Sequence, residues 1–291
     1  MKKATIDLGS NMAQMLIRVD GNEYIFQSFT ALGDGTATTK LLSDQSILRT
    51  IEVLKMFKRH LSQFGINSDE VVLCATAACR LATNREYFFE RVLALGLHPA
   101  LLTAEQEAYL ASHAILSGQE NITEFVALDI GGASTELVLL DEQKRISSFV
   151  SLNIGTLIAS EYVKEGSYAP YYENLVQLNT SHLLSFVKKK MICTRGTMTT
   201  IFNIVLNNNN AIETDYHQKV LASENIINRL NEIKNYSEKD LKRLFPYIEP
   251  RMYTMPGAIE LVLSLLKTLE IEQVTLSNRG LVHGAMELLF K

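Results

Sequence analysis

Apolar runs alternate with helically spaced apolar positions along this chain, in an order that predicts two successive α/β units. Short apolar runs predict strands at residues 3–8, 12–19, 22–28, 70–75, 125–130, 135–140, 145–152, 191–195 and 273–276. Apolar positions at helical spacing predict helices at residues 45–63, 85–95, 104–117, 155–164, 172–189, 197–206, 222–233, 238–244 and 256–269. Each unit then opens with an antiparallel strand meander and adds parallel strands through helical connections.

A polar stretch, SGQENITE at residues 117–124, separates the two units and predicts the domain boundary. We expect one domain at residues 1–120 and a second at 121–279, with the C-terminal residues 280–291 packing back on the first. A further polar stretch at residues 206–215 predicts a loop.

Composition is that of an ordinary globular protein, with 291 residues of which 47% are hydrophobic and 21% charged. The formal net charge of -4 gives no general attraction to nucleic acid or to an anionic membrane, so we expect neither as a partner. No apolar run approaches the roughly 18 residues that a transmembrane helix needs. The sparse cysteines, Cys74, Cys79 and Cys193, are typical of buried thiols in a reducing cytoplasm.

One sequence pattern occurs twice in the chain. The segments ATIDLGSNMAQMLIRV (4–19) and ALDIGGASTELVLL (127–140) each end an apolar strand on an aspartate, turn on glycine and resume a strand. This arrangement places a carboxylate at a strand tip and leaves backbone N–H groups free in the turn. A single copy is explained by an aspartate that caps a turn. Two copies, one opening each domain, favour a cleft for phosphate and a divalent cation.

Motifs in the same order resemble those of the exopolyphosphatase / guanosine pentaphosphate phosphohydrolase (Ppx/GppA) family. The most specific is LDIGGASTEL (128–137), which is close to D-x-G-G-G-S-T-E-L. The other matching segments are IDLGSNMAQML (6–16), ALGDGTATTKLLSDQSI (31–47), ATAACRLATN (75–84), LLTAEQEAYLA (101–111), SLNIGTLIASE (151–161), RGTMTTI (195–201) and the C-terminal PGAIELVLSLLKTLEIEQVTLSNRGLVHG (256–284).

This resemblance implies an α/β fold of two RNase H-like domains, of the actin-like ATPase superfamily, with a cleft between them. The chain resembles the short, two-domain form of the family. The activity implied is cytoplasmic, Mg²⁺-dependent or other divalent-cation-dependent hydrolysis of a terminal phosphoanhydride. The substrate implied is inorganic polyphosphate or a guanosine penta- or tetraphosphate, pppGpp being the hydrolysable one.

The resemblance also implies roles for individual residues. Glu107 is the implied general base that activates water, and Arg80 is a positive clamp. Asp129 and Glu136 hold the catalytic metal, with Asp7 opposite. The implied phosphate ligands are Gly9, Ser10, Asn11, Gly131, Gly132, Ser134, Thr135 and Thr197. Phosphoryl transfer needs mainly positioning and charge neutralisation, so these residue types suit it.

Most of these residues also have a simple structural interpretation that needs no catalytic role. Thr103 and Gln106 form the pattern of a capping box, so Glu107 is also explained as a favourable charge in a first helical turn. Thr197 is equally an N-cap or a ligand contact. Arg80 is otherwise an exposed arginine. Asp129 has no inexpensive structural explanation, because it closes a buried apolar strand.

Several positions depart from the family pattern and remove positive charge or glycine. The departures are Met12 for serine, Gln14 for a basic residue, Ala31 for arginine, Leu157 or Ile158 for arginine, Ala133 for the third glycine and Asn278 for aspartate; Arg195, at a usual glycine, adds a charge. Each lost charge-assisted phosphate contact weakens binding by about 1.5–3 kcal/mol.

Three functions therefore compete. The first is a metal-dependent hydrolase of polyphosphate or pppGpp, which the complete acidic set favours. The second is a weak or inactive protein that binds and senses polyphosphate or (p)ppGpp, which the missing cations favour. The third and weakest is an ATP-dependent kinase or chaperone of the same superfamily, since a shared fold does not determine function. A homodimer is one of the oligomeric states left open.

Overall fold

The computed structural model describes residues 2–290 apart from 117–123, 144, 195 and 209–215. Within the described residues the chain forms two compact units. Unit 1 comprises residues 1–114 and 281–291, and unit 2 comprises residues 115–280. The predicted boundary after residue 120 lies outside the described residues.

Unit 1 contains a five-stranded sheet, among the described residues, in the order β3-β2-β1-β4-β5. Its strands are β1 (Lys2–Leu8), β2 (Met12–Val19), β3 (Asn22–Phe29), β4 (Val71–Ala75) and β5 (Pro99–Leu101). The first three form the predicted antiparallel meander, and β4 and β5 continue from β1 in parallel. The carboxyl ends of β1 and β4 therefore meet at one edge of the sheet.

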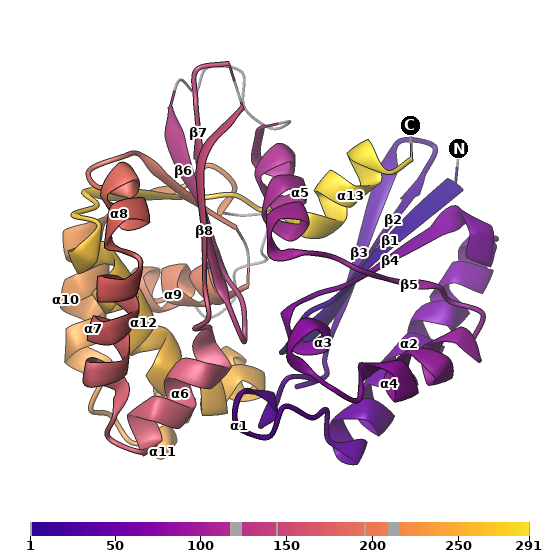
Figure 1. The fold of residues 1–291 in the computed structure, drawn as a ribbon, viewed down its shortest axis with the longest axis horizontal. Helices are drawn as coiled ribbons and strands as arrows, with labels where there is room; N and C mark the ends of the chain where they lie inside the picture. Colours follow the sequence, from indigo (N-terminus) through magenta and orange to yellow (C-terminus); the bar gives the residue numbers. More distant parts are fainter. Residues whose placement is uncertain (1, 117–123, 144, 195, 209–215, 291) are drawn as a thin grey trace. The chain divides into compact units, whose positions relative to one another are not determined.

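Helices cover both faces of this sheet (Figure 1). Its helical elements are α1 (Thr36–Thr39), α2 (Asp44–Phe64), η1 (Ser68–Glu70), α3 (Ala77–Leu81), α4 (Arg85–Leu93), α5 (Ala104–Leu116) and α13 (Leu281–Leu288). The buried face of α2 follows the predicted spacing and packs in the main core with β1 and β2. On the other face, Val282 and Met286 of α13 pack on Leu16, and Thr5 Oγ1 donates to Val282 O at 2.7 Å. The C-terminal helix is thus part of unit 1.

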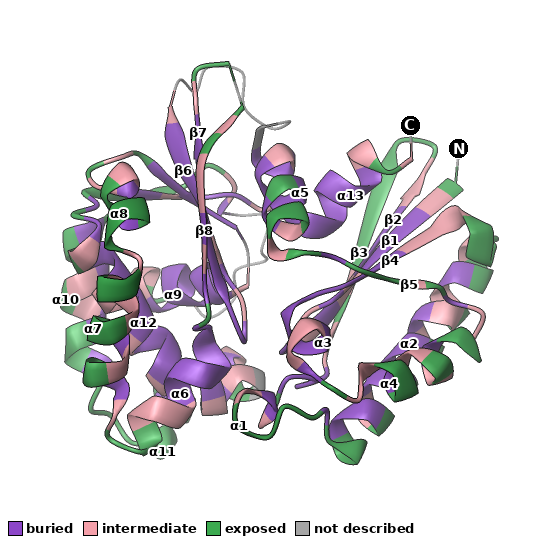
Figure 2. Ribbon diagram, in the orientation of Figure 1, coloured by how far each residue is buried: buried purple, intermediate pink, exposed green. Residues whose placement is uncertain are grey.

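Unit 2 contains a six-stranded sheet, among the described residues, in the order β10-β11-β9-β6-β7-β8. Its strands are β6 (Phe125–Ile130), β7 (Thr135–Leu140), β8 (Ile146–Leu152), β9 (Met191–Cys193), β10 (Val220–Ala222) and β11 (Gln273–Leu276). Strands β6, β7 and β8 repeat the antiparallel meander of unit 1, and β9 and β11 continue from β6 in parallel. Figure 2 shows the central strands as largely buried.

Unit 2 also carries most of the helices. They are α6 (Thr156–Lys164), α7 (Tyr168–Leu178), α8 (Thr180–Leu183), η2 (Leu184–Phe186), α9 (Thr197–Leu206), α10 (Ser223–Ile233), α11 (Glu238–Leu244), η4 (Pro246–Thr254) and α12 (Met255–Thr268). Helix α12 lies directly against α6, because a Cβ added to Gly257 would lie 2.5 Å from Ser160 Oγ and 2.6 Å from Thr156 O. None of the described helices combines the length and the uninterrupted apolar sequence of a bilayer-spanning segment.

Two kinds of sequence-based prediction are wrong in detail. The single helix predicted at 172–189 is three elements, α7, α8 and η2, because Asn179 leaves helical geometry at φ −113° and its Nδ2 donates to Leu175 O at 2.8 Å. The elements α1, η1, α3, η4, β5, β10 and α13 are not predicted, and most of them are too short or too irregular to show a hydrophobic period. Residues 209–215 of the predicted polar loop lie outside the described residues.

Candidate functional site

The first aspartate–glycine hairpin joins β1 to β2. Asp7 lies on β1 directly opposite Gln14 of β2. Gly9 N donates to Met12 O at 3.1 Å and closes the turn. The carbonyl groups of the turn bind the segment 30–33: Ser10 O accepts from Gly33 N at 2.8 Å. Because C=O and N–H point in opposite directions across a trans peptide, the N–H of the following residue points away from that segment.

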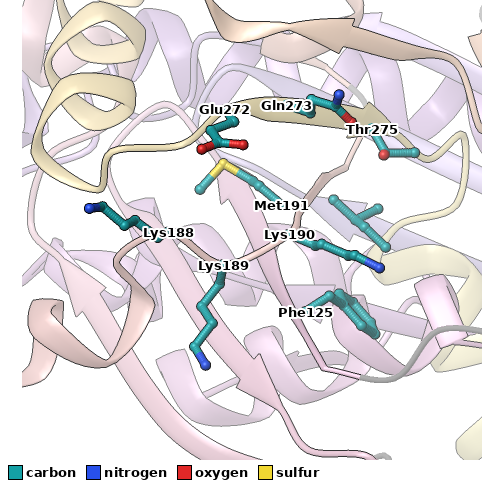
Figure 3. A pocket seen from close by; sticks show the side chains of 9 residues that line it. Phe125, Lys188, Lys189, Lys190, Met191, Glu272, Gln273 and Thr275 are labelled. Atoms are coloured by element: carbon teal, nitrogen blue, oxygen red, sulfur yellow. The ribbon is translucent and has the colours of Figure 1, made fainter.

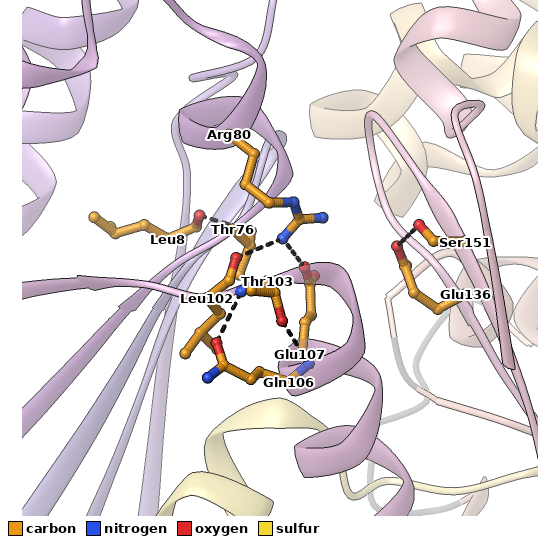
Figure 4. Close-up of polar contacts among 9 residues, drawn as sticks. All are labelled: Leu8, Thr76, Arg80, Leu102, Thr103, Gln106, Glu107, Glu136 and Ser151. Atoms are coloured by element: carbon orange, nitrogen blue, oxygen red, sulfur yellow. Dashed lines mark hydrogen bonds and ion pairs between the residues drawn. The ribbon is translucent and has the colours of Figure 1, made fainter. Parts of the chain in front are cut away.

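Arg80 and Glu107 form an ion pair in unit 1, with 2.6 Å between Arg80 Nη1 and Glu107 Oε2 (Figure 4). Arg80 lies on α3, directly after β4, and its Nη1 also donates to Leu102 O at 3.2 Å. Only 20% of the Arg80 side chain and 13% of the Glu107 side chain are exposed. A pair this shielded is more strongly coupled than a surface ion pair. The structure therefore brings the predicted clamp and the predicted base together.

The capping box predicted at the start of α5 is confirmed. Thr103 N donates to Gln106 Oε1 at 2.9 Å, and Gln106 N donates to Thr103 Oγ1 at 3.1 Å (Figure 4). Thr103 and Gln106 therefore already satisfy the helix terminus. Capping needs no contribution from the Glu107 side chain, which turns instead to Arg80.

The second hairpin places two carboxylates opposite one another in unit 2. Asp129 of β6 pairs directly with Glu136 of β7. Directly opposed residues of an antiparallel pair share a face of the sheet, with Cβ atoms about 4.5–5.5 Å apart. Glu136 is 2% exposed and Asp129 is half-buried, so the Glu136 carboxylate lies almost out of contact with water. Two adjacent buried negative charges are unfavourable unless a proton or a cation lies between them.

A hydroxyl group holds each of these acids. Thr194 Oγ1 donates to Asp129 Oδ1 at 2.6 Å, and Ser151 Oγ donates to Glu136 Oε1 at 2.8 Å. Desolvation raises the pKa of Asp129, and the Thr194 hydrogen bond opposes part of that rise. Sequence reasoning assigned no role to Thr194 or Ser151. The available signal was position, since Thr194 directly follows β9, the parallel neighbour of β6.

The glycine turn between β6 and β7 resembles the turn of unit 1. Gly131 N donates to Ser134 O at 3.0 Å. The N–H groups of Thr156 and Leu157, in the first turn of α6, donate to Gly131 O at 2.9 Å and Gly132 O at 2.8 Å. The N–H groups of Gly132 and Ala133 consequently point away from α6. They form no hydrogen bond within the described part of the chain. Such paired N–H groups form an anion-binding nest.

Ala133 is compatible with this turn. Its φ is not positive, so the extra methyl group causes no left-handed strain. Ala133 is 4% exposed, which places its methyl group in the protein interior. The departure from the third glycine therefore leaves the N–H groups of the turn intact.

Two of the predicted phosphate ligands use their hydroxyl groups inside the protein. Thr135 Oγ1 donates to Ile154 O at 2.6 Å, and Thr197 Oγ1 donates to Ile130 O at 2.9 Å. Thr135 is fully buried. These hydroxyl groups fix the two ends of the β6–β7 turn region in the structure. Ser134 and the backbone of Gly131 and Gly132 remain beside them in the same turn.

The positions that lost a cation have acquired other roles. Ala31 adopts φ 44°, and its N–H donates to Asn11 O at 2.9 Å. Leu157 and Ile158 are 3% and 6% exposed and pack in the core, so neither position offers a polar group. Arg195, the predicted added charge, lies outside the described residues. The described part of the site thus has fewer cations than the family pattern predicts.

The residues suit a divalent cation coordinated by few protein ligands. No group of three or more His, Cys, Asp or Glu residues able to hold a metal occurs among the residues that the structure describes. Asp129 and Glu136 together are a two-carboxylate set. Mg²⁺ commonly binds one or two carboxylates and takes its other ligands from water and substrate phosphates. The opposed pair therefore fits Mg²⁺ better than it fits a closed structural metal site.

The cysteines do not contribute nucleophiles. Burial raises the pKa of the Cys74 and Cys79 thiols to about 12 and raises that of Cys193 as well. All three are free and buried, as predicted. A thiol that stays protonated at neutral pH is a poor nucleophile.

One pocket of about 290 Å³ lies elsewhere in unit 2 (Figure 3). Its lining includes Phe125, Met191 and Gln273, which begin the parallel strands β6, β9 and β11. Asp129 and Thr194 lie at the opposite, carboxyl ends of these strands, where ligands bind in open α/β sheets. The pocket is therefore separate from the candidate site.

Comparison with known proteins shows the family and the fold. The sequence profile of the Ppx/GppA phosphatase family matches residues 27–289. The chain belongs to the Ppx/GppA phosphatase family. The crystal structure of the family member from Aquifex aeolicus is 28% identical, with a TM-score of 0.78, and the match covers 99% of this chain and 98% of that one. The fold is accordingly that of two RNase H-like domains.

Curated relatives of this Ppx/GppA chain are longer. It is 27% identical over 271 residues to a bifunctional 3-dehydroquinate synthase/phosphatase of Fusobacterium nucleatum, covering 84% of this chain and 40% of the relative. It is 24% identical over 305 residues to guanosine-5'-triphosphate,3'-diphosphate pyrophosphatase of Pseudoalteromonas atlantica, covering 98% of this chain and 58% of the relative. An exopolyphosphatase of Cytophaga hutchinsonii, 19% identical with a TM-score of 0.85 over 99% of this chain and 97% of that one, shares the fold.

Proposed function

We propose that this Ppx/GppA protein is a divalent-cation-dependent phosphohydrolase that releases the terminal phosphate of inorganic polyphosphate or pppGpp. The observation that carries the proposal is the opposed pair Asp129 and Glu136 beside a turn whose N–H groups point away from α6. Carboxylates for a metal and a nest for phosphate oxygens are what phosphoryl transfer requires. The relative from Pseudoalteromonas atlantica, a guanosine-5'-triphosphate,3'-diphosphate pyrophosphatase, supports the same class of chemistry.

In this mechanism Asp129 and Glu136 would hold Mg²⁺, which supplies charge neutralisation for the phosphate oxygens when bound. The N–H groups of Gly132 and Ala133 bind phosphate oxygens. Asp7, near the end of β1 in unit 1, stays a prediction from the sequence as a metal ligand. Gly9, Ser10 and Asn11 supply the corresponding turn of unit 1.

Glu107 is the proposed general base, which removes a proton from the attacking water. Its Oε2 accepts a hydrogen bond from Arg80 in the absence of substrate. Arg80 therefore holds the carboxylate in one orientation and favours its charged form, which is the form that accepts a proton. A substrate phosphate would draw part of the Arg80 charge away and leave Glu107 free to act.

A second function, binding without turnover, is favoured by the scarcity of cations. Gln14 lies opposite Asp7 where the family pattern has a basic residue, and Leu157 and Ile158 are buried. In that case Arg80 keeps Glu107 paired, and the site would bind its ligand without turnover. The cytoplasmic location and the homodimer stay predictions from the sequence.

The test is phosphate release by the purified protein from long-chain polyphosphate, tripolyphosphate, pppGpp and ATP, each with Mg²⁺ and with EDTA. Glu107→Gln is the control, since it keeps the side-chain shape and removes the base. Release that needs the cation and falls to background in the variant supports the hydrolase, and the ranking of substrates names it. Release equal to the variant on every substrate, together with thermal stabilisation by one of them, supports the binding function instead.

A further inference from the structure

The segment Ser151–Leu157 runs from the end of β8 into α6. Four of its residues form hydrogen bonds with the glycine turn between β6 and β7 or with the start of β7. Ser151 Oγ donates to Glu136 Oε1, and Ile154 O accepts from Thr135 Oγ1. Thr156 N and Leu157 N donate to the carbonyl oxygens of Gly131 and Gly132. One short segment therefore contacts the glycines, the threonine and the glutamate of the motif.

Gly155 is the closest contact in this arrangement. A Cβ built on Gly155 would lie 2.5 Å from Gly131 O and 2.6 Å from Ala133 N, and both of these are backbone atoms of the turn. Gly155 has φ −127° and ψ −174°, an extended conformation that any residue adopts. Glycine is needed here for space and not for backbone freedom.

The same contact supplies hydrogen-bond acceptors to the first N–H groups of α6. The first N–H groups of a helix have no partner inside the helix, and a side chain usually caps them. Gly155 has no side chain to do so. The carbonyl groups of Gly131 and Gly132 take that role. Since C=O and N–H are opposed across each peptide, docking these carbonyls on α6 determines the direction in which Gly132 N and Ala133 N point.

We infer that Ser151–Leu157 is a positioning segment that sets the direction of the phosphate-binding N–H groups and the orientation of the Glu136 carboxylate together. The inference rests on the proposed function and adds residues to its site. Ser151, Gly155 and the first turn of α6 act through the turn and Glu136, and touch no substrate. The glycine turn and the Glu136 carboxylate then move together, because the same seven-residue segment binds both.

The experiment measures binding separately from turnover. Tripolyphosphate with Mg²⁺ is titrated by calorimetry into the wild type, Gly155→Ala and Ser151→Ala, and kcat and KM are measured in parallel. Gly155→Ala is expected to weaken tripolyphosphate binding at least tenfold, because the methyl group displaces the turn. Ser151→Ala is expected to raise the Mg²⁺ concentration needed for half-maximal binding several-fold, and Ser151→Thr is expected to restore it.

Matched controls separate positioning from general stability. Gly280→Ala adds a methyl group where nothing lies within 4 Å. Ser148→Ala removes another β8 hydroxyl, one that bonds Ser185 Oγ at 2.9 Å. Both controls are expected to bind tripolyphosphate within twofold of the wild type. Circular dichroism and the Tm of each variant verify the fold.

Folded Gly155→Ala that binds tripolyphosphate as the wild type does overturns the inference, as does Ser151→Ala with an unchanged Mg²⁺ requirement. Should Gly155→Ala not fold, the Ser151 pair and its control decide. A wild type that binds tripolyphosphate but releases no phosphate contradicts the proposed hydrolase, while the binding titrations still test the positioning segment. A wild type that binds none of it overturns both.

Discussion

The hairpins β1–β2 and β6–β7 both have an aspartate before a glycine turn, but they differ in the residue opposite that aspartate. Asp7 of unit 1 is opposite Gln14, whereas Asp129 of unit 2 is opposite Glu136. Both turns close with a glycine N–H donated to the carbonyl three residues later. Two opposed carboxylates need a proton or a cation between them, whereas one carboxylate beside an amide does not. In the proposed function, unit 2 would hold the metal, and unit 1 would carry the base Glu107 with Arg80.

The support behind the turns also differs. In unit 1 the carbonyl of Ser10 is held by Gly33 N, which belongs to a loop. In unit 2 the carbonyls of Gly131 and Gly132 are held by the first turn of α6. A helix end is held by its own hydrogen-bond ladder, so the unit 2 turn has the more rigid backing. The comparison teaches that the turn backed by a helix is the one that would bind phosphate in the proposed function, while the half with loop support holds Arg80 and Glu107.

Exchanging the opposing residues should produce the largest effect. Glu136→Gln gives unit 2 the acid–amide pair of unit 1, and we expect kcat to fall by about 10³-fold because the cation loses one of two carboxylates. Gln14→Glu makes the reverse change in unit 1. Added to Glu136→Gln, it should not restore activity by creating a second metal site. Phosphate release against Mg²⁺ concentration measures both. Full activity in Glu136→Gln would show that the two hairpins do not differ as argued.

Breaking the ion pair of unit 1 is the next largest change. Arg80→Met is expected to lower kcat by about 10²-fold, in the range of losing general-base catalysis. Arg80→Lys, which keeps the charge, should retain more of the kcat than Arg80→Met, as measured by phosphate release. A rise in kcat in Arg80→Met would instead identify the pair as an inhibitory lock.

A smaller effect is expected where α13 supports α5. A Cβ added to Gly284 would lie 2.6 Å from the carbonyl carbon of Leu110, one helical turn beyond Glu107. Gly284→Ala should therefore destabilise the protein by about 1–3 kcal/mol through overpacking and lower kcat by displacing α5. Urea unfolding and kinetics measure the two effects, with Gly280→Ala as the uncrowded control. Normal stability in Gly284→Ala would contradict the close approach of these helices.

The smallest effect concerns the stability of the metal-free protein. Desolvation raises the folded-state pKa of Asp129 above its ordinary value. The folded state then holds the proton more tightly, so the contribution of Asp129 to stability decreases as pH rises through the folded-state pKa. Asp129→Asn removes that cost, and at pH 7.5 in EDTA we expect a Tm about 2–4 °C higher.

This gain should shrink as the pH is lowered towards 4, because a carboxyl with a raised folded-state pKa gains its proton first in the folded state and then carries less of the cost of a desolvated charge. Scanning calorimetry across that pH range provides the test. An Asp129→Asn protein less stable than the wild type in EDTA would mean that the carboxylate is already compensated without a cation.

Sequence reasoning predicted the two antiparallel meanders and the parallel strands added to them, because strands and helices have different hydrophobic periods. The acidic residues at the strand ends were predicted from the motifs. It also predicted the capping box of α5 from Thr103 and Gln106, a pattern confined to four residues. It did not predict the break at Asn179 or the three-residue strands, where the period is too short to detect.

The sequence by itself determined the element order, the family and the positions of Asp7, Asp129 and Glu136 at strand ends. Only the tertiary structure decided what these acids contact. Thr194 reaches Asp129 across 65 positions of the chain, and Arg80 reaches Glu107 across 27. Such partners depend on which strands are neighbours and in which register. Local patterns encode the period of each element, whereas register is set by how whole elements pack.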